Sequence, residues 1–450
     1  MAVLVVLALE FFRGSAATST SVVWPVLQAG VAASALVFAW RHQTELKLLP
    51  VVVLGVVFQL AWIGLHLALG VPSDFDSKFI YAPQGNMLLH GTYPASEYPP
   101  GAVLLFALEA LLGGGQTRVS HAFVMVPFHL LLILAIWALR TRWSAWFATI
   151  AAFWPPNAFI TEFKFDVVPA ALLVLGFVLA LREKWFLAGA ALGLGAAVKW
   201  TPALVVAALG LWLLTTGRRR SAAAHLAGGV VIFLALNAPF LVWSPDEVLG
   251  AYTSQGARGI IGESLPYVPL RALGLTQSVL PWHAADVPHW ANPAAIAIQA
   301  LAVLATFGAV VATRRNARAA FAIAAMIPVV FLVLNRVFSP QFLTVLLAAW
   351  LVAGSLLAKT RADQLVLGIL VFSASLANAL VYPTLPSIWP YFSVILFIFA
   401  LAATMWVFVR AGTLDALAMR ARERHIPGER ERDDDPSQRR AQPWPRPSLP

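Results

Sequence analysis

Residues 48–70 read LLPVVVLGVVFQLAWIGLHLALG, and residues 73–101 read SDFDSKFIYAPQGNMLLHGTYPASEYPPG. The first segment is apolar over a length that crosses a hydrocarbon core of about 30 Å. The second is an acid-rich loop that leads into the next apolar stretch. Ionisable groups beside lipid are costly unless they meet water, a charged partner or a substrate. The two segments therefore predict a membrane protein whose chemistry lies in its loops.

The composition of the whole chain agrees with this prediction. Hydrophobic residues make up 60% of 450 positions and charged residues only 12%, whereas soluble domains carry about 25% charged residues. The chain has no cysteine, which excludes disulfides, thiolate catalysis and cysteine-bound metals. We expect an all-α, polytopic integral membrane protein with about 11–14 transmembrane helices and a functional site in extracytoplasmic loops. The predicted helices span residues 22–40, 48–70, 98–114, 122–139, 144–160, 165–182, 186–199, 201–216, 222–243, 291–313, 319–337, 341–358, 364–382 and 388–410.

The basic loops predict how the chain is oriented. Lys and Arg concentrate in short cytoplasmic loops of membrane proteins, so the net charge of +10 does not call for a nucleic-acid partner. Placing 41–47 and 218–220 inside puts the loops 71–97 and 244–290 outside. Arg140 and Arg142 also belong inside, yet two spans between 98 and 139 would place them outside. One boundary between 98 and 164 is therefore misplaced, or one segment is re-entrant.

The chain divides into two parts at about residue 410. Residues 1–410 form the predicted transmembrane domain. Residues 411–450 mix dense charge of both signs with proline, which is typical of a disordered tail. We expect this tail in the cytoplasm and the protein in a bacterial plasma membrane, in contact with membrane lipids.

Two acids in the first outer loop are the leading candidates for catalysis. Asp74 and Asp76 flank Phe75, and in an extended loop residues two apart point to the same side. A carboxylate whose pKa is raised beside lipid suits a general base. The residues alone are equally compatible with a solvated acidic loop.

Other charged residues lie at predicted membrane boundaries. Glu97 and Tyr98 precede Pro99-Pro100, which by themselves make a rigid helix start. We expect Lys164 to pair internally with Glu162 or Asp166 rather than with a ligand. Lys199 lies in a long apolar stretch and needs an anion, either a carboxylate or a phosphate. Arg336 raises the same question, with snorkelling to lipid headgroups as its alternative.

Isolated polar residues within the spans, such as Glu109 and His129, are expected to form helix–helix hydrogen bonds. The sequence contains no pair of histidines at the spacing typical of a zinc site. It also contains no phosphate-binding loop and no dinucleotide-binding fingerprint. The outer loop 244–290 combines aromatic residues with charged groups, an arrangement that suits both sugar stacking and the interfacial aromatic belt. Its charged residues are Asp246, Glu247, Arg258, Glu263, Arg271 and Asp286.

Four patches in order resemble glycosyltransferase family 87 of the GT-C superfamily, whose members use polyprenyl-phosphate sugar donors. The first is DFD, followed by YAPQGNMLLHGTYP and EYPPG. The others are FDVVPAALLVL, AGAALGLGAAVKWTP and NRVFSPQF. Together they cover roughly residues 60–340.

The resemblance implies an enzyme without a cofactor or bound metal that transfers a mannose-like hexose, or a pentose, to a lipid or glycan acceptor in cell-envelope biosynthesis. Asp74 or Asp76 would deprotonate the acceptor hydroxyl, with Asp74 as the first choice because it follows the preceding span most directly. Cationic residues would neutralise the phosphate leaving group. The substrate-binding residues that it implies are Tyr81, Tyr93, Glu97, Tyr98, Asp166, Lys199, Arg258, Arg271, Arg336 and Gln341.

The main alternative is a transporter or lipid flippase, and a non-catalytic assembly partner with the same fold is a third. A transporter is expected to hold its polar residues near the membrane midplane on broken helices. Here the acids cluster in loops at one face, which favours an enzyme.

Overall fold

The computed structural model describes residues 23–43, 45–68, 75–113, 117–153, 163–381 and 389–412. Across these residues the regular structure is helical, with one isolated β-bridge between Ile261 and Ala284. The all-α, polytopic prediction is therefore confirmed. The α-helices are α2 (Val23–Arg41), α3 (Leu48–Ala68), α4 (Ala82–Leu89), α5 (Pro100–Gly113), α6 (Thr117–Trp137), α7 (Ser144–Ala152), α9 (Val167–Leu181), α10 (Trp185–Val198), α11 (Pro202–Thr215), α12 (Arg219–Trp243), α13 (Pro245–Ala257), α14 (Tyr267–Ala272), α15 (Ala291–Ala312), α16 (Ala317–Val333), α17 (Leu343–Leu357), α18 (Arg361–Ala379) and α19 (Trp389–Arg410), with a π-turn η1 (Ser77–Tyr81) and a 3-10 turn η2 (Pro340–Phe342).

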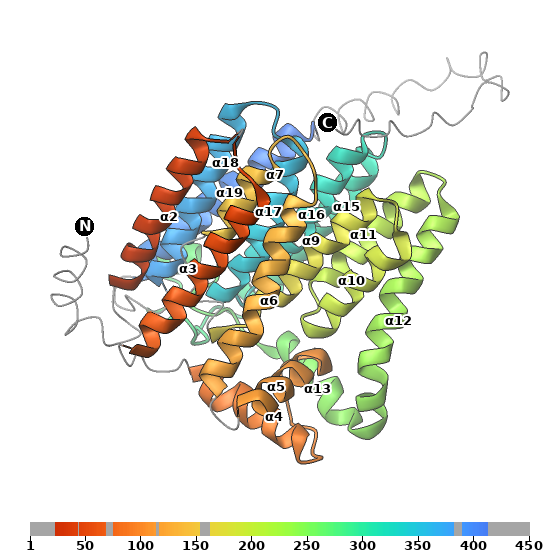
Figure 1. Ribbon diagram of the computed structural model, residues 1–450. Coiled ribbons are helices and arrows are strands. Elements are labelled where there is room, and N and C mark those ends of the chain that lie inside the picture. The colour runs from red at the N-terminus through yellow and green to blue at the C-terminus, as the bar shows by residue number, and fades with distance from the viewer. Residues whose placement is uncertain are drawn as a thin grey trace.

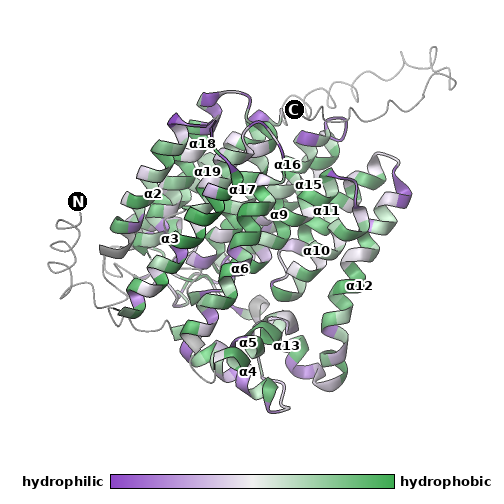
Figure 2. Ribbon diagram, in the orientation of Figure 1, coloured by the Kyte–Doolittle hydropathy of each residue, from purple (hydrophilic) through white to green (hydrophobic). Residues whose placement is uncertain are grey.

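The helices form a large bundle with a smaller group of helices beneath it (Figure 1). We call α4, α5 and α13, which lie together below the bundle in this view, the lower layer. Within the described residues, seven helices are long and apolar enough to cross a membrane: α3, α6, α12, α15, α17 with its preceding turn, α18 and α19. The bundle helices are predominantly hydrophobic along their length, as Figure 2 shows. Such an outer surface is suited to contact with lipid.

Helix α5 resolves the conflict over orientation between residues 98 and 164. The sequence predicts this helix as a candidate span, but its 14 residues extend only about 21 Å, and it lies in the lower layer (Figure 1). It packs there against α4, because Gly85 lies directly on the backbone of Phe106. The prediction that this helix is a span is therefore wrong. With α5 confined to one end, α6 runs upward and the loop with Arg140 and Arg142 joins the other basic loops.

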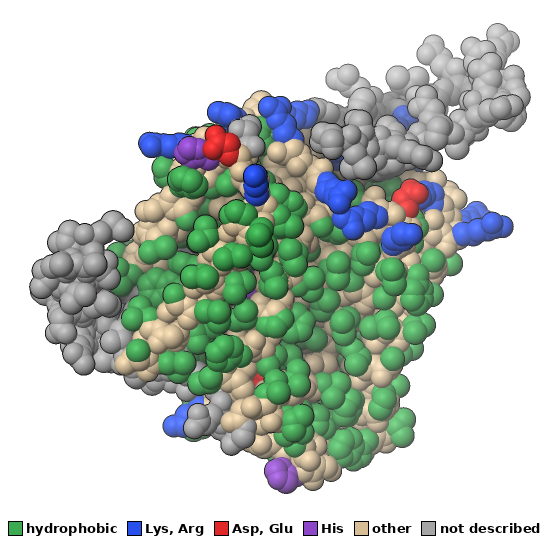
Figure 3. Space-filling model, viewed as in Figure 1, with side chains coloured by type: hydrophobic (Ala, Val, Ile, Leu, Met, Phe, Trp, Pro, Cys, Tyr) green, Lys and Arg blue, Asp and Glu red, His purple; other side chains and the backbone are tan. Residues whose placement is uncertain are grey.

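Lys and Arg side chains gather along the upper end of the molecule in the space-filling view (Figure 3). This is the end at which α2 meets α3 and α17 meets α18 (Figure 1). The lower layer lies at the opposite end. The two ends of the bundle therefore differ in their content of basic residues, as the positive-inside rule describes.

The centre of the bundle is α17, of which 94% is buried together with the preceding turn. Beside it, α10 and α12 approach closely at glycines. A side chain at Gly189 would collide with the carbonyl oxygen of His225, and one at Gly193 with that of Gly229. Small residues at these positions let two backbones touch, a common way to pack membrane helices.

Helices α10 and α11 have 14 residues each, so each is about 21 Å long and shorter than the membrane core. The turn between them contains Lys199, Trp200 and Thr201, as the sequence predicts. Gly101, at the start of α5, lies against the carbonyl oxygen of Ala197 at the end of α10. The Lys199 turn therefore lies where the bundle meets the lower layer.

Candidate functional site

The first ion pair of the candidate site joins the acidic loop to the segment before α9. The Nζ atom of Lys164 lies 2.5 Å from Oδ2 of Asp76, and the neighbouring Ser77 hydroxyl donates to the carbonyl oxygen of Phe163 over 3.1 Å. A π-turn follows Asp76 directly, and such turns are frequent at functional sites. This turn brings the Tyr81 hydroxyl back to donate to the same carboxylate oxygen over 3.5 Å. Asp76 is thus held by two elements 88 residues apart.

A second ion pair lies beside the first. Nζ of Lys199 is 2.5 Å from Oδ1 of Asp166, the residue before α9, whose side chain is fully buried. The ammonium also lies over the rings of Phe165 and Phe342, 5.3 and 4.3 Å from their centroids. The anion that the sequence requires for Lys199 is therefore a protein carboxylate. It follows that Asp166 is bonded to Lys199 rather than to Lys164, its neighbour in sequence.

Aromatic side chains form one wall of this region. The Tyr81 ring stacks on Phe106 at 4.4 Å between centroids and meets Tyr98 and Phe165 edge-on. Tyr98 is buried and hydrogen-bonds Tyr81. Burial, with the nearby carboxylates of Glu97 and Asp76, raises the pKa of Tyr98 well above its ordinary value. Tyr98 is therefore neutral and able to donate a hydrogen bond at physiological pH.

A third ion pair connects the acidic loop to the large loop after α13. Arg258 pairs with Glu97, two residues that the sequence places among the substrate-binding candidates. Arg336 lies close to this ion pair in space. Its guanidinium donates to the carbonyl oxygen of Gly256, two residues before Arg258, over 3.0 Å. Its own carbonyl accepts from the amide of Ile261, also over 3.0 Å. Arg336 therefore holds the large loop in place and does not simply extend to lipid headgroups.

Glu263 is a fourth acid in the site. Its side chain is only 5% exposed, and it interacts electrostatically with both Lys164 and Asp76. Burial is the main cause that raises the pKa of Glu263, with Lys164 opposing the shift and Asp76 adding to it, and together they bring the pKa to about 8. The carboxyl group is therefore mostly protonated at neutral pH. The sequence shows Glu263 only as one charge among several in the loop, and its position after Ile260-Ile261-Gly262 is the signal that it is buried.

Several buried oxygens near these pairs have no hydrogen-bond partner among the described residues. They include Oδ2 of Asp166, Oε2 of Glu263, Oε1 of Gln341 and Oγ1 of Thr201. Gln341 adjoins Phe342, whose ring lies under Lys199. Buried polar atoms are normally satisfied, so these groups are available to a polar ligand rich in hydroxyl groups.

Three of the predicted site residues are not part of this network as the structure describes it. Tyr93 is buried away from the ion pairs, against Phe240 and Trp243 at the α12–α13 corner. Arg271 lies exposed in the last turn of α14. Asp74, the first choice for the base from the sequence, lies outside the described residues.

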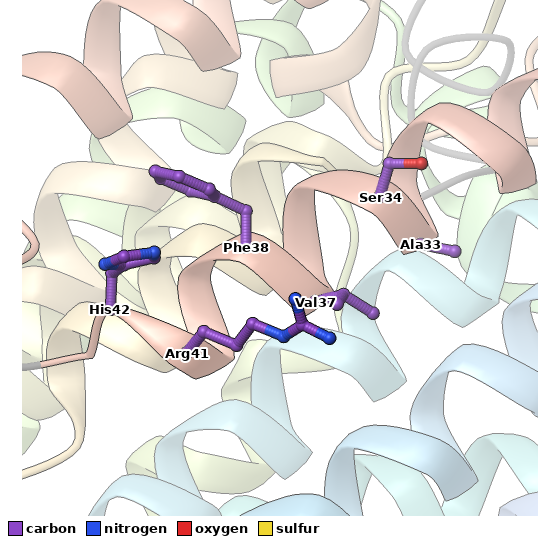
Figure 4. A pocket seen from close by; sticks show the side chains of 6 residues that line it. All are labelled: Ala33, Ser34, Val37, Phe38, Arg41 and His42. Carbon is purple, nitrogen blue, oxygen red and sulfur yellow. The ribbon is translucent and has the colours of Figure 1, made fainter.

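A surface pocket on α2 is separate from the charged site. Its lining residues lie on α2 and at His42 directly after it, and they include Phe38 and Arg41, as Figure 4 shows. None of the residues of the three ion pairs lines it. Elsewhere within the described residues, no group of three or more His, Asp or Glu side chains is arranged to hold a metal ion. The ion pairs at the junction of the two layers are therefore the candidate site.

A helical membrane protein with carboxylates, cations and tyrosines gathered at one end of its bundle has the parts of a membrane-embedded transferase. The model of glycosyltransferase family 87 matches residues 97–340, which is more than half of the chain. The chain belongs to glycosyltransferase family 87 and is a glycosyltransferase, which decides against the transporter and flippase alternatives. No curated protein and no solved structure matches it.

Proposed function

We propose that this glycosyltransferase moves a sugar from a polyprenyl-phosphate donor to a lipid or glycan acceptor on the extracytoplasmic face of the membrane. The single observation that carries the proposal is the cluster of three ion pairs at the end of the bundle opposite the basic loops. The cluster combines carboxylates that can accept a proton with cations that can meet a phosphate. We propose a mannose-like hexose as the sugar, with a pentose as the second candidate.

In the proposed reaction Asp76 accepts the proton of the acceptor hydroxyl. The hydroxyl oxygen forms a bond to the anomeric carbon while the bond from that carbon to the phosphate oxygen breaks. Its electron pair leaves with the polyprenyl phosphate. Asp74 is the alternative base. General-base catalysis of this kind contributes about 10²–10⁴-fold to the rate.

Cations near Asp76 would stabilise the charge that develops on the leaving group. Lys164 already pairs with Asp76, and an anionic donor offers it a second anion, which frees the carboxylate to take a proton. Lys199 and Arg258 are likewise held by single carboxylates. Fixed cations where charge develops are often a large part of catalysis. The proposed site therefore changes from internal ion pairs to contacts with the donor.

The test compares Asp76→Asn with Asp286→Asn, which changes an exposed acid of the large loop. Purified protein in detergent receives short-chain polyprenyl-phosphate hexoses or pentoses and lipid extracts as acceptor. We expect Asp76→Asn to lose at least about 100-fold in transfer rate and Asp286→Asn to retain it. Nucleotide sugars should fail as donors in every variant. Full activity of Asp76→Asn would exclude Asp76 as the base, and turnover with a nucleotide sugar alone would overturn the donor class.

Comparison of lipid-linked glycans by mass spectrometry, from cells with and without the protein, would identify the sugar and acceptor. A missing product should be restored by the wild-type chain and not by Asp76→Asn. Restoration by both would show that the cellular product does not depend on this carboxylate.

A further inference from the structure

Glu263 differs from the other three acids of the site. Asp76, Glu97 and Asp166 each pair with a cation, whereas Oε2 of Glu263 is buried and has no partner among the described residues. Lys164, Lys199 and Arg258 are each engaged in one of these three pairs. A buried carboxyl without a cation is more stable with its proton on.

The fold holds Glu263 rigidly at this position. Its amide donates to the carbonyl oxygen of Pro281 over 2.8 Å, and the amides of Ile261 and Gly262 donate to Arg336 and His283. Gly262 lies directly on the carbonyl of Leu280, where a larger residue would not fit. The carboxyl group is therefore placed by backbone contacts on both sides.

The charged groups that act on Glu263 come from two other segments. Lys164, before α9, and Asp76, before η1, both interact with it electrostatically. The segments bonded to its own loop carry His283, which is exposed, and Arg336, which is turned to the carbonyl of Gly256. Lys164 and Asp76 are therefore the charged groups that act on its ionisation, with Lys164 lowering its pKa and Asp76 raising it.

We infer that Glu263 is a substrate-binding residue that acts in its protonated form and donates a hydrogen bond to a phosphate oxygen of the donor. The inference rests on the proposed polyprenyl-phosphate donor and adds a recognition element to it. A phosphate bound beside Lys164 would present acceptor oxygens to a buried carboxyl group whose Oε2 has no partner among the described residues. A sugar hydroxyl, by contrast, can donate to a carboxylate and would bind Glu263 in either protonation state.

The requirement for protonated Glu263 predicts the direction in which donor affinity changes with pH. Because the pKa of Glu263 is raised to about 8, the donor proton is present below pH 8 and is lost as the pH rises through it. Ionisation removes the hydrogen bond and adds a negative charge that repels phosphate. Donor affinity should then fall by about tenfold per pH unit above this pKa.

The experiment uses tryptophan fluorescence to measure the Kd of a short-chain polyprenyl-phosphate mannose for the full chain in detergent. The pH runs from about 6.5 to about 10, which brackets the titration of Glu263. Glu263→Gln keeps a neutral hydrogen-bond donor of the same shape. Its Kd should match the wild-type value at low pH and stay flat where the wild-type Kd rises. Asp286→Asn, an exposed acid of the same loop, should follow the wild type.

A Glu263→Gln variant whose Kd rises with pH as the wild-type value does would overturn the role of Glu263, and so would a wild-type Kd that stays flat. Difference infrared spectroscopy adds a readout independent of activity: a protonated carboxyl band at neutral pH that is missing in Glu263→Gln. Without that band in the wild type, the inference fails. Absence of probe binding in every variant at every pH would overturn the proposed donor class and this inference with it, whereas binding with unaltered pH dependence overturns Glu263 alone.

Discussion

Lys199, in the turn between the short helices α10 and α11, forms an ion pair with Asp166, the residue before α9. Asp166 is fully buried and Lys199 nearly so. Removing one partner of a buried ion pair leaves an uncompensated charge, which costs about 3–5 kcal/mol, whereas replacing both partners is often neutral. Lys199 therefore contributes to the stability of the protein through this pair and, in the proposed function, to the binding of phosphate as well.

If Lys199 had no partner, Lys199→Met would be expected to fold, because it would remove a costly buried charge. Because Lys199 pairs with Asp166, we expect Lys199→Met to lower the stability of the protein by about 3–5 kcal/mol. The double variant Asp166→Asn with Lys199→Met should recover most of the loss. The midpoint of SDS-induced unfolding, followed by tryptophan fluorescence, measures both variants and the wild type.

The same variants separate structure from function. If Lys199 also meets the donor phosphate, the double variant should fold and still transfer sugar at a strongly reduced rate. A folded double variant with normal transfer would limit Lys199 to a structural role, and the phosphate site would then be sought at Lys164 and Arg258.

At the scale of elements, the contact between α10 and α12 positions the Lys199 turn. Gly189 and Gly193 on α10 face the backbone of α12 at His225 and Gly229. A methyl group at these positions has no room, because the atoms that it would meet belong to a backbone. The C-terminal end of α10, which carries Lys199, therefore depends on how closely these two helices approach.

Gly189→Ala should destabilise the protein by about 1–3 kcal/mol through overpacking, despite the better helix propensity of alanine. Gly308→Ala is the matched control, since a side chain at Gly308 on α15 meets open space and should gain up to about 1 kcal/mol. Unfolding midpoints in SDS compare the two. Equal behaviour of both variants would show that the α10–α12 approach tolerates a methyl group.

At the scale of the whole molecule, the separation of basic residues from the charged site predicts the orientation in the membrane. We propose that the end with the basic loops, and with it the end of α19 at Arg410, faces the cytoplasm of a bacterial cell. The proposed active site then faces outward, where a polyprenyl-linked sugar can enter from the lipid. The predicted tail, 411–450, lies almost wholly outside the described residues and stays a prediction.

The absence of native cysteine makes this orientation directly testable. Arg142→Cys, between α6 and α7, should resist a membrane-impermeant maleimide in intact cells and react after lysis. His90→Cys, exposed at the end of α4, should react in intact cells. Labelling of Arg142→Cys from outside would invert the proposed topology and place the charged site in the cytoplasm.

The sequence by itself determined the membrane class and the position of nearly every long helix. These follow from runs of apolar residues and from prolines, which act locally and leave a direct pattern in the chain. The sequence also proposed Asp76, Lys199 and Arg258 as site residues, and the structure places each of them in an ion pair. The prediction that α5 is a membrane span was wrong, because an apolar run of 14 residues is compatible both with a short span and with a helix that lies at one end of the bundle.

Only the tertiary structure decided which charges meet. Lys164 bonds Asp76 across 88 residues and Asp166 bonds Lys199 across 33, although Lys164 and Asp166 are neighbours in the chain. It also decided that Tyr93 packs at the α12–α13 corner and that Glu263 reaches Asp76 and Lys164. The physical reason is that ion pairing depends on distance in space and on burial. Both are set by the packing of α5, α9 and α10 against the loops, which no local pattern in the sequence records.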